Sequence, residues 1–419
     1  MNELGVVTFW TLLALALGQV PLVWAFVRAL RRGKQDPPAA QPCPKAAVVI
    51  CLRGADPFLV DCLEAILDQD YPQYDVRVVI DSREDPAWQV VQDVIRRRTT
   101  DKLRPTPLTE RRDTCSLKCS SVLQAISELD DSYEVVALLD ADTIPHSGWL
   151  RQLVAPLADD QVGAATGNRW YMPADANWAA LVRYVWNSAA VVQMFCHRIA
   201  WGGTLALKTK VLRDSDLLDR WGHAFCEDTM LHRVLRRRGL RVAFVPSLMM
   251  VNREACQMPG YFRWVRRQML TARLYHPRWL AVVGHGLITS LAQAAAVGVL
   301  IAAMLTGHWQ GAAWAGGGLA CYQIAMLLFL APMEVGVRRV VGARGEPTNW
   351  LAATTAAKLL PAVPLTQTIY SVVLISAILV RRVEWRGVSY QIDGPWEIRL
   401  IEYAPYEASH ATADAMASL

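Results

Sequence analysis

Two carboxylates one residue apart follow a short apolar run near the middle of the chain. The run is Val135–Leu139, and the carboxylates belong to Asp140 and Asp142. In open α/β sheets, ligands bind beyond the carboxyl ends of the strands, and a carboxylate is costly to bury there without a partner. A hard divalent cation that also binds a diphosphate would satisfy both groups. The alternative is an ordinary strand-to-loop turn with solvated acids, because an Asp-x-Asp pattern alone is common.

A second acidic pair, Glu227 and Asp228, opens a helical pattern that continues to Arg238. Asp228 falls at or near the start of this helix, where a carboxylate suits the unpaired backbone amides. Helix capping and catalysis therefore remain alternative roles for its side chain.

A basic and aromatic cluster lies just before a long apolar run, and it contains Arg263, Trp264, Arg266, Arg267 and Gln268. Arginine matches the geometry of phosphate, and tryptophan offers a face for stacking. A basic amphipathic helix that rests on anionic lipid is the alternative interpretation, and the two are compatible.

The elements that must position these side chains alternate between short apolar runs and helical patterns from Lys45 to about Trp279. This alternation favours an α/β domain with a mostly parallel sheet. We predict buried strands at Ala46–Cys51, Val76–Ile80, Val135–Leu139 and Val242–Val245, and helices at Phe58–Leu67, Trp88–Arg97 and Met230–Arg238.

The composition of the 419 residues indicates a membrane protein with local clusters of charge. Hydrophobic residues make up 53%, and a net charge of only +5 excludes a polycation built to bind nucleic acid. The nine cysteines have no metal-binding spacing, so we interpret them as reduced thiols of a cytosolic domain.

The apolar run Gly5–Leu30 is long enough to cross a bilayer, for which about 20 residues suffice. Basic residues follow at its end, namely Arg28, Arg31, Arg32 and Lys34. Because positive charge marks the cytoplasmic side, we expect this end in the cytoplasm. A signal peptide is the alternative, but its basic residues would precede the apolar core.

Two further spans are expected at about Leu280–Leu305 and Ala312–Val335, joined as a hairpin by the loop Gly307–Gly311. The hairpin would return the chain to the cytoplasm, where it carries Arg338, Arg339 and Arg344.

The last apolar stretch, Trp350–Val380, contains Lys358 and two prolines, Pro361 and Pro364. Three arginines follow it, at positions 381, 382 and 386. One straight crossing would place these arginines outside, against the positive-inside rule. We therefore expect a broken, re-entrant or interfacial segment, with a full span as the alternative.

The expected domain organisation follows from these segments. In chain order it comprises an N-terminal transmembrane anchor (1–34), a proline-rich linker (35–44), a cytoplasmic catalytic domain (45–265), an interfacial segment (266–279), a transmembrane hairpin (280–335), a basic cytoplasmic loop (336–349), a broken apolar segment (350–380) and a cytoplasmic tail (381–419). The last dozen residues are expected to be disordered.

Several motifs along the chain support one another by their order. They are Leu52-Arg53-Gly54-Ala55-Asp56-Pro57, Asp68-Gln69-Asp70-Tyr71-Pro72, Asp81-Ser82-Arg83-Glu84-Asp85-Pro86-Ala87, Leu117-Lys118, Asp140-Ala141-Asp142, Trp201-Gly202-Gly203, Glu227-Asp228, Arg263-Trp264 and Glu384-Trp385-Arg386-Gly387-Val388-Ser389-Tyr390. Over about Ala46 to Ile392 the chain resembles family 2 inverting glycosyltransferases with the GT-A fold. Within them it is most similar to ceramide glucosyltransferase and bacterial glycolipid glucosyltransferases.

The resemblance implies a donor site with a metal ion. The residues that would contact the nucleotide sugar are Arg53, Asp81, Lys118, Asp140, Arg263 and Trp264. Glu84 and Asp85 remain alternatives to Asp81 as the first acidic motif, and Lys118 would lie near the diphosphate. Asp142 together with Asp140 would hold Mg²⁺ or Mn²⁺.

The resemblance also implies a catalytic pair and an acceptor site. Asp228 would be the general base, with Glu227 beside it. The acceptor would meet Trp201, Gly202 and Gly203, where glycine allows the backbone a close approach to a substrate. His197 is a further candidate acceptor contact, with ordinary packing as its alternative.

One departure from the family pattern concerns the Arg-Trp motif. The position three residues before Arg263 is Gly260, where the family has Gln or Arg. Arg266, Arg267 or Gln268 could replace the missing contact with the leaving group. The change also weakens the analogy with processive polysaccharide synthases.

The expected reaction is an inverting transfer of a hexose, glucose from UDP-glucose in the simplest case, to a membrane lipid. Tyr275, His276, Pro277 and Trp279 form an interfacial mix beside the basic residues, which favours an acceptor such as ceramide or diacylglycerol. The expected partners are a UDP-sugar, a lipid acceptor and the bilayer, with no nucleic acid. We expect the catalytic domain on the cytoplasmic face of a bacterial inner membrane. A small processive polysaccharide synthase is the alternative function.

Overall fold

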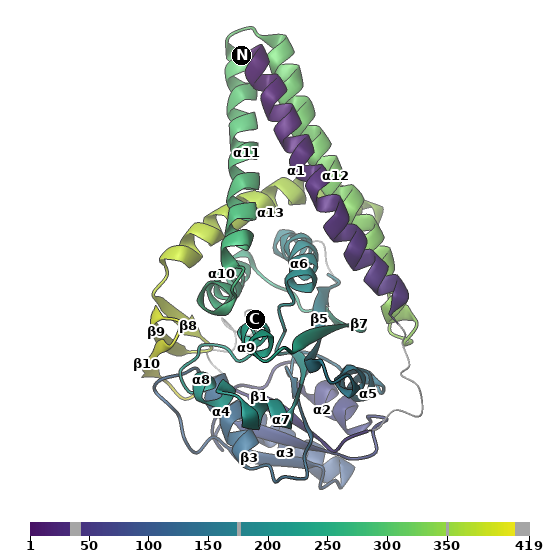
Figure 1. Ribbon diagram of the computed structural model, residues 1–419, viewed down its shortest axis with the longest axis vertical. Coiled ribbons are helices and arrows are strands. Elements are labelled where there is room, and N and C mark those ends of the chain that lie inside the picture. Colours follow the sequence, from purple (N-terminus) through teal and green to yellow (C-terminus); the bar gives the residue numbers. More distant parts are fainter. Residues whose placement is uncertain (34–42, 174–176, 349–351, 407–419) are drawn as a thin grey trace. The chain divides into compact units, whose positions relative to one another are not determined.

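The computed structural model describes residues 1–33, 43–173, 177–348 and 352–406. The expected linker and the last dozen residues fall mainly or wholly outside this range. The chain forms two compact units (Figure 1). A helical unit contains Met1–Arg32, Pro173–His197 and Arg278–Ser376, and a sheet unit contains Gly33–Met172, Arg198–Pro277 and Ala377–Leu419.

In the described part of the chain, the main sheet of this unit has seven strands in the order β3-β2-β1-β4-β6-β5-β7. Their bounds are β1 Ala46–Leu52, β2 Tyr74–Ile80, β3 Leu103–Pro107, β4 Val135–Leu139, β5 Val162–Tyr171, β6 Thr204–Lys208 and β7 Arg241–Asn252. Strand β6 is antiparallel to both of its neighbours, while the other neighbouring strands run parallel. The mostly parallel sheet expected from the sequence is therefore confirmed.

Helices cover both faces of this sheet because its central strands are apolar on both sides. Side chains alternate between faces along a strand, so Val48 and Ile50 of β1 pack in one core and Val49 in the other. The first core includes α2 (Leu59–Leu67), α3 (Pro86–Arg98) and α5 (Trp149–Val154). The second includes α4 (Leu117–Ser127), α7 (Thr209–Asp214), α8 (Leu217–Trp221), α9 (Leu231–Arg237) and α10 (Met258–Tyr275).

The predicted strands and helices of this unit are all present; β4 has the predicted bounds, and the others differ at one or both ends. Strands β3, β5 and β6 were not predicted. Neither was a second, antiparallel sheet at the C-terminal end, formed by β8 (Arg382–Trp385), β9 (Val388–Gly394) and β10 (Glu397–Tyr403). Its first turn is Arg386-Gly387, where φ is +49° and +72°, as a two-residue hairpin turn of the primed type requires.

The C-terminal sheet belongs to the core of the sheet unit. The rings of Trp385 and Tyr390 lie 5.9 and 5.4 Å from that of Phe225. The Tyr390 hydroxyl also accepts a hydrogen bond from the backbone N–H of Leu117 at 3.2 Å. The segment expected as a tail is thus packed against the start of α4.

The helical unit consists of α1 (Asn2–Arg32), α6 (Trp178–His197), α11 (Trp279–Leu305), α12 (Trp309–Gly342) and most of α13 (Ala353–Leu379). All of these except α6 are long and apolar enough to cross a membrane. Helix α1 packs along α12 at small residues, where a Cβ on Gly318 would lie 2.8 Å from Phe9. Close backbone approach at small residues is the usual way for helices to associate in lipid.

Helix α13 is continuous through Pro361 and Pro364, so the expected break in this segment is not a break in secondary structure. The Thr366 hydroxyl bonds back to the carbonyl of Ala362 at 2.6 Å, one way for a membrane helix to accommodate nearby prolines. Polar contacts join α13 to its neighbours, since Gln367 accepts from Gln323 of α12 at 3.1 Å.

Candidate active site

Lys118 joins the two acidic motifs. It lies in the first turn of α4, where the Ser116 hydroxyl accepts a hydrogen bond from the Cys119 N–H at 3.2 Å and caps the helix. The ammonium group is 2.8 Å from Asp140 Oδ1 and 2.8 Å from Glu227 Oε1. One cation therefore connects the end of β4 to the loop that precedes α9.

Arg169 of β5 holds the remaining carboxylate. Its Nη2 lies 3.1 Å from Asp142 Oδ2 and 3.4 Å from Asp140 Oδ2. The guanidinium also lies 4.9 Å from the ring centre of Trp201 and donates to the Tyr171 hydroxyl at 3.1 Å. Arg169 was not predicted as a site residue, because strand β5 that carries it was not predicted and its burial is visible only in the folded structure.

The two glycines after Trp201 have no room for side chains. A Cβ on Gly203 would lie 2.2 Å from the Trp201 ring and 2.6 Å from Asp140 Oδ2. A Cβ on Gly202 would lie 2.1 Å from Glu227 Oε1. The backbone at these two glycines therefore lies close to carboxylates of the protein itself. Its contact with an acceptor stays a prediction.

Asp228 is fixed by two donors. Its Oδ2 accepts from the Gly202 N–H at 2.8 Å, and its Oδ1 accepts from the Thr229 hydroxyl at 2.8 Å. The N-cap of α9 is Met230, and no side chain caps that helix. Helix capping by the Asp228 side chain is therefore not observed, and the partly exposed carboxylate remains open to a substrate.

Burial and ion pairing shift the pKa values of this cluster in opposite directions. Burial raises the pKa of Glu227 against the attraction of Lys118, and it raises the pKa of Asp142 against that of Arg169. For Asp140, burial is outweighed by Lys118 and Arg169, so its pKa lies below the usual value. A further cation would stabilise the charged form of the other two carboxylates.

The three candidates for the first acidic motif have different surroundings. Asp85 caps α3 and accepts hydrogen bonds from the N–H groups of Ala87 and Gly54 at 2.8 and 2.9 Å. Glu84 is exposed. Asp81 is buried at the end of β2 and forms an ion pair with Arg53. The geometry favours Asp81, and its role with a nucleotide stays a prediction.

The Arg-Trp motif lies on α10, and its arginine does not face the cluster. Arg263 is exposed, and within the described part of the chain no hydrogen bond or ion pair ties it to the acidic residues. Arg267 lies close enough to attract Asp140 electrostatically, and its guanidinium is 4.3 Å from the centre of the Trp385 ring. Burial, with repulsion from nearby arginines, lowers the pKa of Arg267 to about 10. Trp264 is 5% exposed and packs edge-on against Tyr171, with ring centres 5.6 Å apart.

His197 lies at the end of α6 in the helical unit. Its Nδ1 is 3.3 Å from Arg278 Nη1, and burial together with this arginine lowers its pKa. Its role with an acceptor stays a prediction.

The oxygen donors of Asp140 and Asp142 fit a hard divalent cation. Mg²⁺ is usually bound by one or two carboxylates together with substrate phosphates. Among the described residues, no group of three or more His, Cys, Asp or Glu side chains could hold a metal alone. Two neighbouring carboxylates, Asp140 and Asp142, are the donor set expected for a metal that shares its coordination with substrate phosphates.

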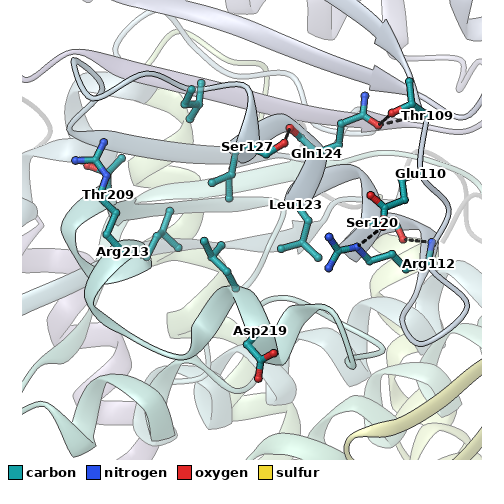
Figure 2. Close-up of a pocket in the computed structure, with 14 residues that line it drawn as sticks. Thr109, Glu110, Arg112, Ser120, Leu123, Gln124, Ser127, Thr209, Arg213 and Asp219 are labelled. Carbon is teal, nitrogen blue, oxygen red and sulfur yellow. Dashed lines mark hydrogen bonds and ion pairs between the residues drawn. The ribbon is translucent and has the colours of Figure 1, made fainter.

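A separate pocket of about 590 Å³ is lined in part by α4 (Figure 2). Leu123, Gln124 and Ser127 of that helix line it, together with Thr209, Arg213 and Asp219. None of the predicted site residues lines this pocket, so the acidic cluster is a different site.

Paired acids beyond the carboxyl ends of the strands of a mostly parallel sheet suit the binding of a nucleotide. The family model of glycosyl transferase family 21 matches residues 7–396. The chain therefore belongs to this family, which confirms both the expected class of enzyme and the expected fold class.

Comparison with solved structures gives more distant likenesses. The chain is similar to "Mannosyltransferase PcManGT from Pyrobaculum calidifontis in complex with GDP-Man and Mn2+", with 20% identity, 89% of this chain and 98% of that chain covered, and a TM-score of 0.46. It is also similar to residues 1–349 of TarS from S. aureus, with 14% identity, coverage of 86% and 100%, and a TM-score of 0.34. No curated protein matches the chain. The assignment therefore depends on the family match.

Proposed function

We propose that this glycosyltransferase transfers a hexose from a UDP-sugar, with glucose as the first candidate, to a hydroxyl group of a membrane lipid. The observation that carries the proposal is the ion-pair cluster in which Lys118 lies 2.8 Å from both Asp140 and Glu227, beside the partly exposed Asp228. Such a cluster supplies a positive centre for a diphosphate and a base for an acceptor within one site.

Asp228 is the proposed general base. Two hydrogen bonds orient its carboxylate, and it would take the proton of the acceptor hydroxyl as that oxygen attacks the anomeric carbon. A positioned base contributes roughly 10²–10⁴-fold in rate. A single in-line displacement inverts the configuration, so an α-linked donor gives a β-linked glycolipid.

The leaving diphosphate would lie against fixed positive charge. Lys118 and Arg169 already surround the Asp140–Asp142 carboxylates, and Arg267 of α10 lies near them. Mg²⁺ or Mn²⁺ held by Asp142 and Asp140 would supply charge neutralisation for the same group when bound. Positive charge fixed in advance stabilises the charge that develops on the leaving group.

A lipid acceptor is supported by the apolar helices and by the start of α11. Among the described residues, four helices have the length and composition to cross a bilayer. Trp279 at the start of α11 suits the headgroup layer. Tyr275 and His276, which the sequence also suggested for that layer, are instead buried, and the Tyr275 hydroxyl accepts a hydrogen bond from the Phe225 N–H at 2.7 Å. A site that opens at the headgroup layer could meet a lipid hydroxyl without removing the lipid from the membrane.

The order of the helices along the chain supports a helix α13 whose two ends lie on the same side of the bilayer as the sheet unit. We propose that this side is the cytoplasm. If α1, α11 and α12 cross, the sheet unit and the residues after α12 lie on the same side. The segment after α13 forms the C-terminal sheet, which packs on Phe225 and α4 of the sheet unit. Both ends of α13 then lie on that side, so we propose an interfacial or re-entrant helix. A bacterial inner membrane is the proposed location.

A small processive polysaccharide synthase is the second candidate. It is supported by the analogy between the chain's motifs and those of processive polysaccharide synthases. Gly260 in place of a polar residue, and only three proposed crossings to surround a polymer, count against it.

Product analysis by mass spectrometry tests the proposal. Detergent-purified protein would be incubated with a panel of UDP-sugars, Mg²⁺ or Mn²⁺ and total membrane lipid, beside Asp228→Asn and the matched control Asp131→Asn, whose side chain is 98% exposed. A lipid one hexose heavier, made by the wild type and Asp131→Asn and lost in Asp228→Asn, is expected. A ladder of added sugars would favour the synthase instead, and equal product from Asp228→Asn would exclude Asp228 as the base.

A further inference from the structure

The end of the site beyond Asp81 is closed by a segment far along the chain. We define the C-terminal strap as residues 397–406, which are β10 and the three residues after it. The N–H of Leu400 donates to the carbonyl of Asp113 at 2.8 Å, and the carbonyl of Ala404 accepts from Arg53 Nη2 at 2.5 Å. These bonds fix the strap against loops at the carboxyl edge of the sheet.

Two tyrosines of the strap enter this end of the site. The Tyr403 hydroxyl donates to Asp81 Oδ2 at 3.0 Å. The guanidinium of Arg53 lies 5.1 Å from the Tyr403 ring centre and 5.8 Å from that of Tyr406. The Tyr406 ring packs directly on Gly54, since a Cβ there would lie 2.4 Å from it. With φ at +78°, Gly54 also has a backbone conformation that suits glycine.

One polar atom at this end has no partner in the described part of the chain. Asp81 is 4% exposed, and its Oδ1 accepts no hydrogen bond there. Leaving a buried carboxylate oxygen without a donor is costly. A ligand with N–H or O–H donors on its edge would satisfy this atom.

The neighbouring tyrosine adds a second requirement for that ligand. The ring of Tyr406 is only half-buried, so part of it can contact a ligand. Flat π systems stack on aromatic side chains regardless of their exact identity. A nucleobase combines a flat face with N–H donors on its edge.

We propose that Tyr403 and Tyr406 form the nucleobase wall of the donor site. Tyr406 stacks on the base, and Tyr403 holds Asp81 so that Oδ1 faces a base N–H. This inference rests on the proposed function, because it assumes a nucleoside diphosphate whose diphosphate lies toward Lys118. If the inference holds, the donor site is complete only after the chain beyond α13 has folded onto the rest of the sheet unit.

Binding of two probes to the full chain tests the wall. UDP contains the base and inorganic pyrophosphate does not, and each would be titrated into detergent-purified protein by calorimetry. Tyr406→Ala is expected to weaken UDP binding by roughly tenfold, the size of one lost stacking contact, and to leave pyrophosphate binding unchanged. In steady-state transfer the donor KM should rise with kcat unchanged.

Two variants separate stacking from general damage to the strap. Tyr406→Phe keeps the ring and should recover most of the UDP affinity that Tyr406→Ala loses. Ile401→Ala removes a side chain that is 46% exposed on the same strand, and it should leave UDP binding unchanged.

The outcomes are distinct. If Tyr406→Ala and the wild type bind UDP with equal affinity, the proposed nucleobase wall is wrong and the proposed function is unaffected. Tighter UDP binding in that variant also overturns the wall, because the ring would then occupy the place of the base. If the wild type binds neither UDP nor pyrophosphate, the result contradicts the proposed function itself.

Discussion

The two ends of the candidate donor site are built in different ways. At the acidic end, Lys118 of α4 and Arg169 of β5 are paired with Asp140, Asp142 and Glu227, which lie in the loops after β4 and before α9. At the other end, one ion pair between Arg53 and Asp81 is covered by aromatic side chains from the strap. The acidic end depends on mutual charge compensation, so removal of any member should affect the fold. The strap end depends on shape, so its changes should affect ligand binding first.

The largest expected effect is at the centre of the acidic end. Lys118→Met leaves Glu227, whose side chain is 2% exposed, without its cation. Breaking a buried ion pair from one side costs about 3–5 kcal/mol, and we expect the low end because Lys118 is itself 20% exposed. Thermal melting in detergent would measure the loss, with Lys208→Met as the matched control. Equal melting of Lys118→Met and the control would show that the acidic end does not depend on compensation.

Glycine substitutions compare close packing at the two ends. Gly203→Ala should cost about 1–3 kcal/mol by overpacking and should impair transfer, because the new Cβ meets Trp201 and Asp140. Gly54→Ala should displace Tyr406 and raise the donor KM. Gly298→Ala is the control, since nothing lies within 4 Å of its added Cβ. Unchanged activity and melting of Gly203→Ala would contradict the crowding described for this turn.

Titration of Glu227 gives a smaller effect that belongs to the acidic end alone. Its pKa in the folded protein is raised, so its contribution to stability is fully present below the unfolded value and is lost as pH rises through the folded value. Glu227→Gln removes this loss. The melting temperature of the variant relative to the wild type should therefore increase with pH. Asp131→Asn should show no such trend, and a difference that falls with pH would contradict a raised pKa for Glu227.

The smallest expected effect is at the strap end. Tyr403→Phe removes one hydrogen bond to Asp81, and such a bond contributes about 0.5–1.5 kcal/mol. The donor KM should rise a few-fold, while melting stays close to that of the wild type. If Tyr403→Phe instead lowered the melting temperature strongly and left the donor KM unchanged, the strap would stabilise the fold, like the acidic end, and would not bind the donor.

Much of the sheet could be predicted because its central strands are short apolar runs between helical patterns. Asp140, Asp142, Glu227 and Asp228 were identified by spacing, but their contacts were not. For Asp228 the sequence left open a helix cap or a base; the structure shows no side-chain cap on α9, and the role as base stays a prediction. The strands missed by the sequence analysis include β6, which runs antiparallel in a sheet expected to be parallel.

By itself the sequence determined the apolar helices, the strand–helix alternation and the acidic pairs, since each is encoded by neighbouring residues. Only the tertiary structure decided which cations meet those acids. Arg169 and Arg267 lie near the cluster because of the order of the strands and the orientation of α10. Neither can be predicted from neighbouring residues in the sequence. The same holds for the strap that carries Tyr403 and Tyr406, since the bond from Arg53 to Ala404 joins residues 351 positions apart. Contacts at such separation depend on the folded sheet, which brings distant segments to one edge.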